Sequence, residues 1–479
     1  MLLRKAVISA GIMVGISLFI YGADDKPKND QPEKTWTEYP MTYSSDWKVL
    51  KDIATINPQI MDITNNTKVP LPNLKAKDKK GFRCSAGGKT AQLDVDGDNT
   101  LEKDLQDKEN FVTYKIDYDD GTAPVPYVLR VWQKSVRKVG KDEIPAWAFQ
   151  RACFMQGKTP LGDFILIDDN NNGYYDDFGE DSIIIGSGAT KQVELLSSII
   201  NIKGKFYECK THYSGNKLSL KEYTEPLGKV DMLSGFNFPK QKIDRVVIGG
   251  VDNVYFNVPL QTKSIPLPVG EYYLYSAILS NGKFKVKGNP DAKFKIENSD
   301  PKTDKDKGKP MVFSWGAPFK FMAEPICEKG GVLGKMTAAG SYVAPKREDK
   351  PLDCPFVKME LPKILGCKDE EYITTEIVRD DNGRQTDTMA DITLTKIAVE
   401  IVDKNIKKDP KPLNKIGNMH VDSWIQVDLS GLVEKSIPFW EKYQCPLYDF
   451  RGTVIIRLTT KSSLFGDLKY ESELEITDK

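Results

Sequence analysis

The sequence predicts a mainly β protein built from several antiparallel β-sandwich-like domains in tandem. Short runs rich in β-branched and aromatic residues recur along the chain, and Gly, Asn and Asp residues separate them. This spacing of short strands and turns is typical of antiparallel sheets. The 479 residues are enough for two to four domains with cores of their own. The run Leu195–Ile200 is also compatible with a brief helix, but it is too short to change the fold class.

Residues 1–22 have the pattern of a signal peptide. Arg4 and Lys5 precede the uncharged, mostly apolar run Ala6–Tyr21. This run is short for a membrane span of about 20 residues, which favours a cleaved signal peptide. An uncleaved anchor is the alternative, because a large residue occupies the position three before the expected cleavage site. We therefore expect an exported protein, periplasmic, cell-surface or extracellular, that meets a membrane only through an uncleaved N-terminal segment.

Residues 23–78 are expected to form a charged tether and an N-terminal extension. The stretch Asp24–Lys34 is charged and proline-spaced, which predicts disorder. In residues 35–78 one short helix is predicted to dock on the following domain through apolar residues, namely Trp47, Val49, Leu50, Ile53 and Ile56.

Residues 79–228 form the first predicted domain, a β-domain with acidic cation-binding loops. Short apolar or alternating runs predict its strands. These runs are Thr90–Val95, Phe111–Asp117, Tyr127–Trp132, Ala146–Phe154, Phe164–Ile167, Ser182–Ile185, Ile199–Ile202, Lys205–Cys209 and Lys217–Tyr223.

The most informative stretch of this domain is an oxygen-rich loop between two apolar runs. Calcium prefers six to eight oxygen ligands from carboxylates, amides and backbone carbonyls. Such oxygens recur at loop positions 1, 3, 5, 7 and 9, with Gly173 at position 6. The predicted calcium ligands are Asp168, Asn170, Asn172, the carbonyl of Tyr174, and Asp176, with Asp181 as the closing carboxylate.

In this spacing the loop resembles an EF-hand calcium-binding loop. It departs from that pattern at position 12, where Gly179 stands in place of a bidentate Glu. The apolar runs on both sides of the loop also predict strands, whereas an EF-hand loop lies between helices. The two amide ligands imply weak binding of the extracellular kind. Asp168→Ala is expected to abolish stabilisation by calcium, whereas Asp169→Ala, at a non-ligand position, should hardly change it. The alternative is an Asn-Gly hairpin turn with solvated acids.

A second acidic loop in this domain offers another cation site. Carboxylates stand at positions 1, 3, 5 and 9, provided by Asp94, Asp96, Asp98 and Glu102. Asn99 replaces the glycine at position 6, and Leu105 stands at position 12, which weakens the match. A third acidic stretch, Asp117–Gly121, is interpreted as a turn only.

Two further β-domains are predicted after residue 228. Residues 229–325 contain Pro268-Val269-Gly270-Glu271-Tyr272, followed by a long aromatic strand and an Asn281-Gly282 hairpin turn. This Pro-x-Gly-x-Tyr segment resembles the strand of immunoglobulin-like or prealbumin-like β-sandwich modules of secreted bacterial proteins. Residues 326–479 form a C-terminal β-domain with four clear strands, Ile392–Val402, Ser423–Leu429, Thr453–Thr460 and Tyr470–Ile476.

Composition and cysteine spacing narrow the function classes. Lys+Arg and Asp+Glu are both 68, so a strongly basic nucleic-acid binder is not expected. The seven cysteines contain no Cys-x-x-Cys pair, which argues against a zinc site. Export permits disulfides, and one or two are predicted within the set Cys327, Cys354, Cys367 and Cys445.

The sequence also lacks several catalytic signatures. Neither a Gly-x-Ser-x-Gly elbow, an His-Glu-x-x-His motif nor a Gly-x-Gly-x-x-Gly loop occurs, and the two histidines have no partner motif. The order of signal peptide, acidic-loop β-domain and sandwich modules resembles large uncharacterised exported bacterial β-proteins. That resemblance implies a compartment and an architecture, with no activity attached.

The leading hypothesis is an exported, multi-domain, non-enzymatic β-protein that binds calcium weakly for structural reasons and contacts a surface protein, matrix or glycan. The alternative is a carbohydrate-active hydrolase or its accessory binding domain. A hydrolase needs two facing carboxylates beside aromatic platforms. The candidate platforms are Trp132, Trp147, Trp315, Trp424 and Trp440.

Overall fold

The structure is a computed structural model of the chain, and its contacts divide the chain into residues 1–35 and 36–479. It describes residues 35–53, 55–64, 67–75, 80–87, 89–139, 142–188, 191–280, 284–298 and 309–329, and shorter segments between 335 and 477. The predicted signal peptide, the tether Asp24–Lys34, the Asn281-Gly282 turn, Cys354, Trp424 and Trp440 lie outside the described residues. Within the described part, no helix has the length and apolar character needed to span a bilayer.

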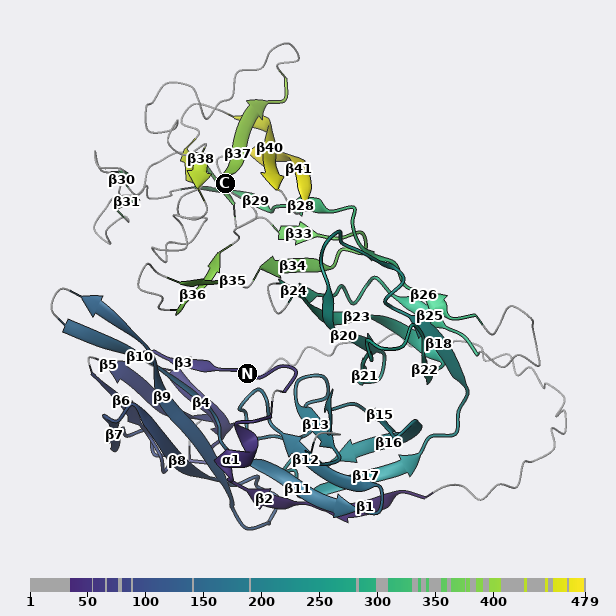
Figure 1. Cartoon of the computed structure of the whole chain (residues 1–479). Coiled ribbons are helices and arrows are strands. Elements are labelled where there is room, and N and C mark those ends of the chain that lie inside the picture. Colours follow the sequence, from purple (N-terminus) through teal and green to yellow (C-terminus); the bar gives the residue numbers. More distant parts are fainter. Residues whose placement is uncertain are drawn as a thin grey trace, which may run out of the picture. The chain divides into compact units, whose positions relative to one another are not determined.

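The described residues are nearly all β-structure in multiple separate antiparallel sheets, which confirms the predicted mainly β class. Among the described strands only two short pairs are parallel. They are β18 (Leu227–Asp231) with β26 (Met311–Val312), and β19 (Phe236–Asn237) with β27 (Trp315–Gly316). Figure 1 shows the strands of each sheet side by side.

Four sheets and one helical turn make up the N-terminal β-region. The first sheet has the strand order β1 (Thr37–Pro40), β17 (Lys217–Glu222), β16 (Lys205–Thr211), β15 (Ile199–Ile202). The second sheet has the order β3 (Met61–Ile63), β10 (Asp142–Arg151), β9 (Val125–Val139), β8 (Glu109–Ile116). The third sheet has the order β14 (Gln192–Leu195), β13 (Ser182–Ile185), β12 (Gly162–Ile167), β11 (Phe154–Thr159), β2 (Thr42–Ser44). The fourth sheet has the order β4 (Thr67–Pro72), β5 (Lys80–Gly87), β6 (Thr90–Leu93), β7 (Lys103–Leu105).

The next sheets follow from residue 227 onward. The largest has the order β21 (Val254–Asn257), β20 (Ile243–Gly250), β23 (Gly270–Leu279), β24 (Phe284–Lys287), β34 (Glu371–Thr374), β33 (Lys363–Leu365), β28 (Lys320–Met322), with β25 (Phe294–Ile296) also on β23. Beside it are β22 (Ile265–Pro268), β18 (Leu227–Asp231), β26 (Met311–Val312), and the pair β19 (Phe236–Asn237), β27 (Trp315–Gly316).

The remaining strands form four small sheets. They are β29 (Pro325–Lys329), β32 (Pro355–Met359), β39 (Gln444–Pro446); β30 (Lys335–Met336), β31 (Tyr342–Val343); β35 (Glu376–Arg379), β36 (Gln385–Ala390); and β38 (Gln426–Asp428), β37 (Lys396–Asp403), β40 (Gly452–Ser462), β41 (Gly466–Ile476).

Strand partners cross two of the predicted domain boundaries. Strands β1 to β4, from the predicted extension, pair with β17, β11, β10 and β5. Strand β34, from the predicted C-terminal domain, pairs with β24. The pattern of a strand reports its buried face and not its neighbour, so the sequence had no means of showing these pairings.

The predicted helix in the extension is shorter than expected. α1 covers only Trp47–Leu50 and begins at Asp46, whose side chain accepts the backbone N–H of Lys48. The predicted run Ala146–Phe154 is two strands, because β10 ends at Arg151 and β11 begins at Phe154. The run Leu195–Ile200 is not helical, since β14 ends and β15 begins inside it.

Two large cores hold these sheets together. One lies in the N-terminal β-region and includes Trp147, Tyr127 and Phe164. The other lies among the sheets that follow and includes Trp315 and Phe294. At the predicted Pro-x-Gly-x-Tyr segment, the buried Tyr272 hydroxyl donates to the carbonyl of Pro268, 2.9 Å away. This bond ties the start of β23 to the end of β22.

The cysteines described with their side chains are free thiols: Cys84, Cys153 and Cys209 are buried, Cys327 is half-buried and Cys367 is exposed. In the β29–β32–β39 sheet, Cys327 and Cys445 both pair with Val357 from opposite sides. Two strand spacings of about 4.8 Å separate their backbones, which exceeds the Cα separation of about 7 Å that a disulfide can bridge. This register does not allow the Cys327–Cys445 bridge.

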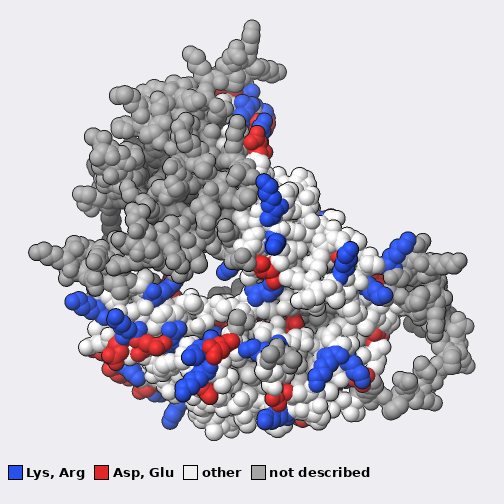
Figure 2. All heavy atoms as spheres, in the orientation of Figure 1, with Lys and Arg blue, Asp and Glu red and all other residues white. Residues whose placement is uncertain are grey.

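Charge is balanced on the face drawn in Figure 2, where acidic and basic side chains are interspersed among the described residues. This distribution fits the formal net charge of zero for the whole sequence.

Candidate functional site

The first acidic loop begins where β12 ends, and its first residue is fully buried. Asp168 accepts the backbone N–H groups of Asn172 (3.2 Å) and Gly173 (2.6 Å). Its second oxygen also accepts the Tyr127 hydroxyl at 2.6 Å. Burial raises the pKa of Asp168, although these hydrogen bonds oppose the shift. Because the carboxylate at position 1 accepts backbone N–H groups of its own loop, it holds the loop in a tight turn around that carboxylate.

The amide side chains at positions 3 and 5 continue the same curl. Asn170 Oδ1 accepts the N–H of Asn172 at 3.1 Å, and Asn172 Oδ1 accepts the N–H of Tyr174 at 2.8 Å. Asn171 and Gly173 have positive φ angles of 62° and 83°, a conformation that Asn and Gly tolerate best. The predicted ligands at positions 1, 3 and 5 therefore lie on one tight loop, as their spacing suggested.

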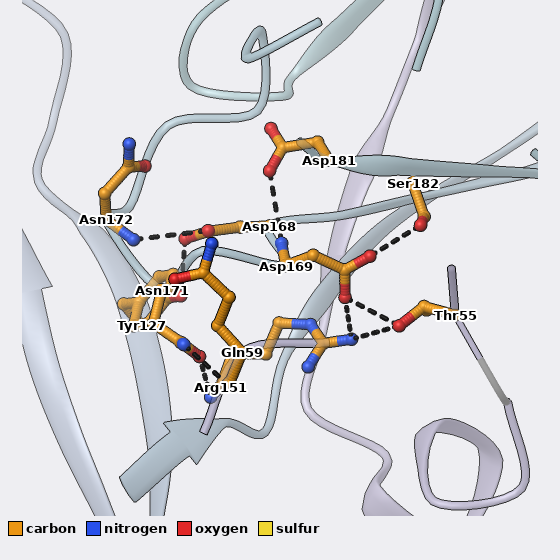
Figure 3. A network of polar contacts seen from close by, with 10 residues as sticks. All are labelled: Thr55, Gln59, Tyr127, Arg151, Asp168, Asp169, Asn171, Asn172, Asp181 and Ser182. Atoms are coloured by element: carbon orange, nitrogen blue, oxygen red, sulfur yellow. Dashed lines mark hydrogen bonds and ion pairs between the residues drawn. The ribbon is translucent and has the colours of Figure 1, made fainter. Parts of the chain in front are cut away.

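Asp169, which the sequence placed at a non-ligand position, has a structural role that the sequence did not indicate. Its carboxylate is fully buried and accepts hydrogen bonds from Arg151 (2.5 Å), Thr55 (2.8 Å) and Ser182 (2.5 Å). Figure 3 shows Asp168 and Asp169 pointing to opposite sides of the chain, Asp168 toward Asn172 and Asp169 toward Arg151. Asp169 thus anchors the base of the loop in a buried ion pair.

At the far end of the loop, Asp177, which is not among the predicted ligands, bonds the two asparagine side chains at positions 3 and 5. Asp177 Oδ2 accepts the side-chain amides of Asn170 (2.9 Å) and Asn172 (2.6 Å). Asp176 is half-buried, and its pKa is raised by burial and by the charge of Asp177. The sequence missed Asp177 because the EF-hand template assigns position 9, and this loop is not continued by a helix.

Asp181, the predicted closing carboxylate, is buried and close to Asp168. It accepts the backbone N–H groups of Asp169 (3.1 Å) and Asp177 (3.3 Å). Burial raises its pKa well above the usual range, and the charges of Asp168, Asp177 and Asp169 raise it further, in that order. Burial and neighbouring like charges both disfavour the ionised form of a carboxyl group, so Asp181 holds its proton more strongly than an exposed aspartate does.

Gly179, at position 12, packs closely against an aromatic ring. It has a φ of +82°, and a Cβ there would overlap the ring of Tyr255 from β21. Its carbonyl accepts the Tyr275 hydroxyl of β23 at 2.9 Å, and its N–H donates to Leu196 at 2.9 Å. Only glycine fits this contact, which explains why the ligand expected at position 12 is absent.

The second acidic loop, between β6 and β7, brings its four predicted ligands together. One carboxylate oxygen each from Asp94, Asp96, Asp98 and Glu102 lies within 4.8 Å of the other three. Among the described residues, this is the one group of three or more such side chains close enough to share a metal ion. An acidic cluster able to hold a metal ion is therefore present, and no ion identity follows from it.

The backbone of this second loop repeats the curl of the first. Asp94 is fully buried and accepts the N–H groups of Gly97 (2.7 Å) and Asn99 (3.1 Å). Asp96 accepts the N–H of Asp98 at 3.1 Å. Asn99 adopts the left-handed conformation, with a φ of 77°, that glycine would have taken.

The loop also has a polar contact with Asn73, the residue that follows β4. Asn73 donates its side-chain amide to the carbonyls of Gly81 (2.9 Å) and Gly97 (3.3 Å). The phenol of Tyr114 is fully buried below the loop, and burial raises its pKa, followed by the charges of Cys84, Asp94 and Glu102. Its hydroxyl has no hydrogen-bond partner among the described residues.

A row of aromatic rings connects the first loop with the third acidic turn. Tyr174, Tyr118, Tyr213 and His212 follow one another with ring centroids 5.8, 5.2 and 4.0 Å apart, and all four are half-buried. Tyr118 donates its hydroxyl to the carbonyl of Gly173 at 2.5 Å, and Tyr213 donates to Asp120. The sequence missed this row because its members come from three separate loops.

Two of the three predicted tryptophan platforms that the structure describes are not at the surface. Trp147 and Trp315 are fully buried in the two large cores. Trp132 is half-buried beneath the guanidinium of Arg130, 4.3 Å from its ring centroid. His212 bonds Ser214 Oγ through Nδ1 at 2.7 Å, a local turn contact.

Comparisons with known proteins add no family to these observations. No family model matches the chain, and neither the curated proteins nor the solved structures contain a match. The fold and the acidic clusters define the class only as far as a mainly β, multi-sheet protein with a cluster that can hold a metal ion.

Proposed function

We propose that this chain is an exported, multi-domain β-protein in which calcium stabilises two loops of the N-terminal β-region, and that it contacts a surface protein, matrix or glycan without catalysis. The observation that carries the proposal is the second loop, where four carboxylate oxygens lie within 4.8 Å of one another. Four like charges at this spacing repel strongly, and a hard divalent cation with oxygen ligands removes that repulsion.

The first loop supports the same proposal by a different argument. Its proposed ligand oxygens are those of Asp168, Asn170, Asn172, the Tyr174 carbonyl, Asp176 and Asp181. Their carboxylates do not lie as close together as those of the second loop. Burial of two mutually repelling acids disfavours an empty, fully ionised loop. The amide ligands favour weak affinity, on the order of 10⁻⁴ to 10⁻³ M, which suits a compartment rich in calcium.

Export and partner binding are supported by the sequence and by the surface chemistry. The charged start and apolar run of residues 1–22 favour export. The aromatic row of Tyr174, Tyr118 and Tyr213 offers half-exposed rings beside carboxylates, a combination suited to a polar partner with an apolar face. The hydrolase alternative still requires two carboxylates facing each other about 5–9.5 Å apart in a cleft.

Isothermal titration calorimetry of the chain from Trp36 onward, first freed of metal by chelation, tests the calcium part. We expect heat for one or two calcium ions per chain and little for magnesium, which demands near-octahedral geometry. Fractionation of expressing cells tests the export part, with the mature protein expected outside the cytoplasm. Absence of calcium heat up to about 10 mM, an order above the weak end of the expected range, refutes the calcium sites.

A further inference from the structure

One face of the five-stranded sheet β14-β13-β12-β11-β2 is only half covered. The single turn of α1 places Leu50 over Phe154, Ile167 and Ile184, which form a small core with it. Beside this core, the same face is hollowed into a cavity of about 650 Å³. Small-molecule sites commonly enclose roughly 300–1,000 Å³, so this cavity has the size of a ligand site.

The floor of the cavity changes from polar to apolar along one row of paired residues. Thr42 pairs with Gln156, Gln156 with Ile165, and Ile165 with Ile184. The row therefore runs from a hydroxyl and an amide over β2 and β11 to two isoleucines over β12 and β13. Val49, which is 43% exposed, and Ile53 add an apolar wall from α1.

The charges around the cavity favour an anion. Lys158 and Lys191 line it against a single acid, Asp163. Lys158 is exposed and stands opposite Asp163 in the β11–β12 register, so the two lysines and this acid leave one net positive charge at the cavity. Lys191 Nζ donates to the carbonyl of Asp52 at 3.4 Å, a bond that leaves its charge unneutralised.

We propose that this cavity binds an amphiphilic carboxylate, with the acyl chain over Ile165 and against Val49, and the carboxylate beside Lys158. An apolar lining with a few placed polar groups is the usual composition of small-molecule sites. The lysines supply the charge complementarity that selects an anion over a cationic or neutral chain of equal length. This site is separate from both acidic loops, so it neither requires nor predicts calcium.

Fluorescence titration with 11-(dansylamino)undecanoic acid tests the site on the chain from Trp36 onward. We expect a saturable rise in emission that dodecanoate reverses and dodecyltrimethylammonium does not. Octanoate, decanoate and dodecanoate should compete with affinities that rise about fourfold for each added methylene, until the apolar end is filled.

Two surface substitutions locate the ligand. Val49→Asp and Lys158→Glu should each weaken probe binding about tenfold or more, because one puts a charge on the apolar wall and the other repels the carboxylate. Matched controls carry the same changes outside the cavity: Ile60→Asp, at a side chain 49% exposed, and Lys205→Glu, on β16. Both controls should bind the probe as the wild type does.

Four results overturn the proposal. One is the lack of a saturable signal up to about 100 µM probe, a hundredfold above a micromolar Kd. Another is equal displacement by the cationic amphiphile, or equal binding by the cavity variants and their controls. The last is a wild-type dimer in sedimentation velocity that Val49→Asp dissociates, because the face would then be an interface between two copies.

Discussion

The second acidic loop permits a prediction in which one substitution has opposite effects with and without calcium. Glu102→Gln removes one of the four clustered charges, while its remaining side-chain oxygen can still accept the N–H of Val95, now 3.1 Å away. In chelator, the variant should be more stable than the wild type, since it relieves repulsion. When calcium is added, the variant should gain less stability than the wild type gains, because the variant has lost one charged ligand.

The sizes of both effects follow from the geometry. At the upper separation of 4.8 Å, each pair of like charges repels by about 0.9 kcal/mol in water. Screening at physiological ionic strength roughly halves this energy, so three pairs amount to about 1.4 kcal/mol. Calcium at 100 times Kd adds about 2.7 kcal/mol to the wild type, and a tenfold weaker variant gains about 1.4 kcal/mol at the same concentration.

Thermal melts followed by circular dichroism check this prediction. At about 2–4 °C per kcal/mol for a domain of 150–250 residues, calcium should raise the wild-type Tm by about 5–11 °C and that of Glu102→Gln by about 3–6 °C. Asp104→Asn is the matched control, because it removes a charge from the adjacent strand β7, outside the cluster. A variant that melts no higher than wild type in chelator and responds equally to calcium refutes the reasoning.

Three further predictions concern the first loop and its surroundings. Asp169→Asn breaks the buried ion pair with Arg151 and should lower the free energy of unfolding by about 3–5 kcal/mol in urea titrations, where a change below about 1 kcal/mol would contradict the pairing. Gly179→Ala should destabilise the chain more than Gly188→Ala, because both have positive φ and cost about 1–2 kcal/mol in backbone strain, but only Gly179 faces a ring; equal Tm losses would refute the packing role. Glu194, whose pKa burial raises from 4.5 to about 7, should make stability fall as pH rises between those values, on the order of 3 kcal/mol, and Glu194→Gln should flatten this pH dependence.

The sign of the Glu194 prediction follows from which state holds the proton. The folded chain keeps the proton up to about pH 7, while the unfolded chain loses it near 4.5. The stabilisation is therefore complete below about pH 4.5 and lost as pH rises through about 7. Urea midpoints measured between pH 4 and pH 8 would show the slope, and an equal slope in the Gln variant would assign it to other groups.

The sequence by itself determined the fold class and the acidic loop whose carboxylates could hold a metal ion. Alternating runs separated by Gly, Asn and Asp are local signals, because side-chain period and turn chemistry act within a few residues. The same holds for Asp94, Asp96, Asp98 and Glu102, whose spacing alone brings their carboxylates together once the chain turns.

Only the tertiary structure decided what lies around these loops. The role of Asp169 depends on Arg151, from a different strand, and the glycine at position 12 depends on the Tyr255 ring, about 75 residues further along the chain. The aromatic row and the half-covered sheet face likewise combine side chains from separate segments. Such contacts depend on which strands pair and which faces pack, and the period of a strand does not encode its partner.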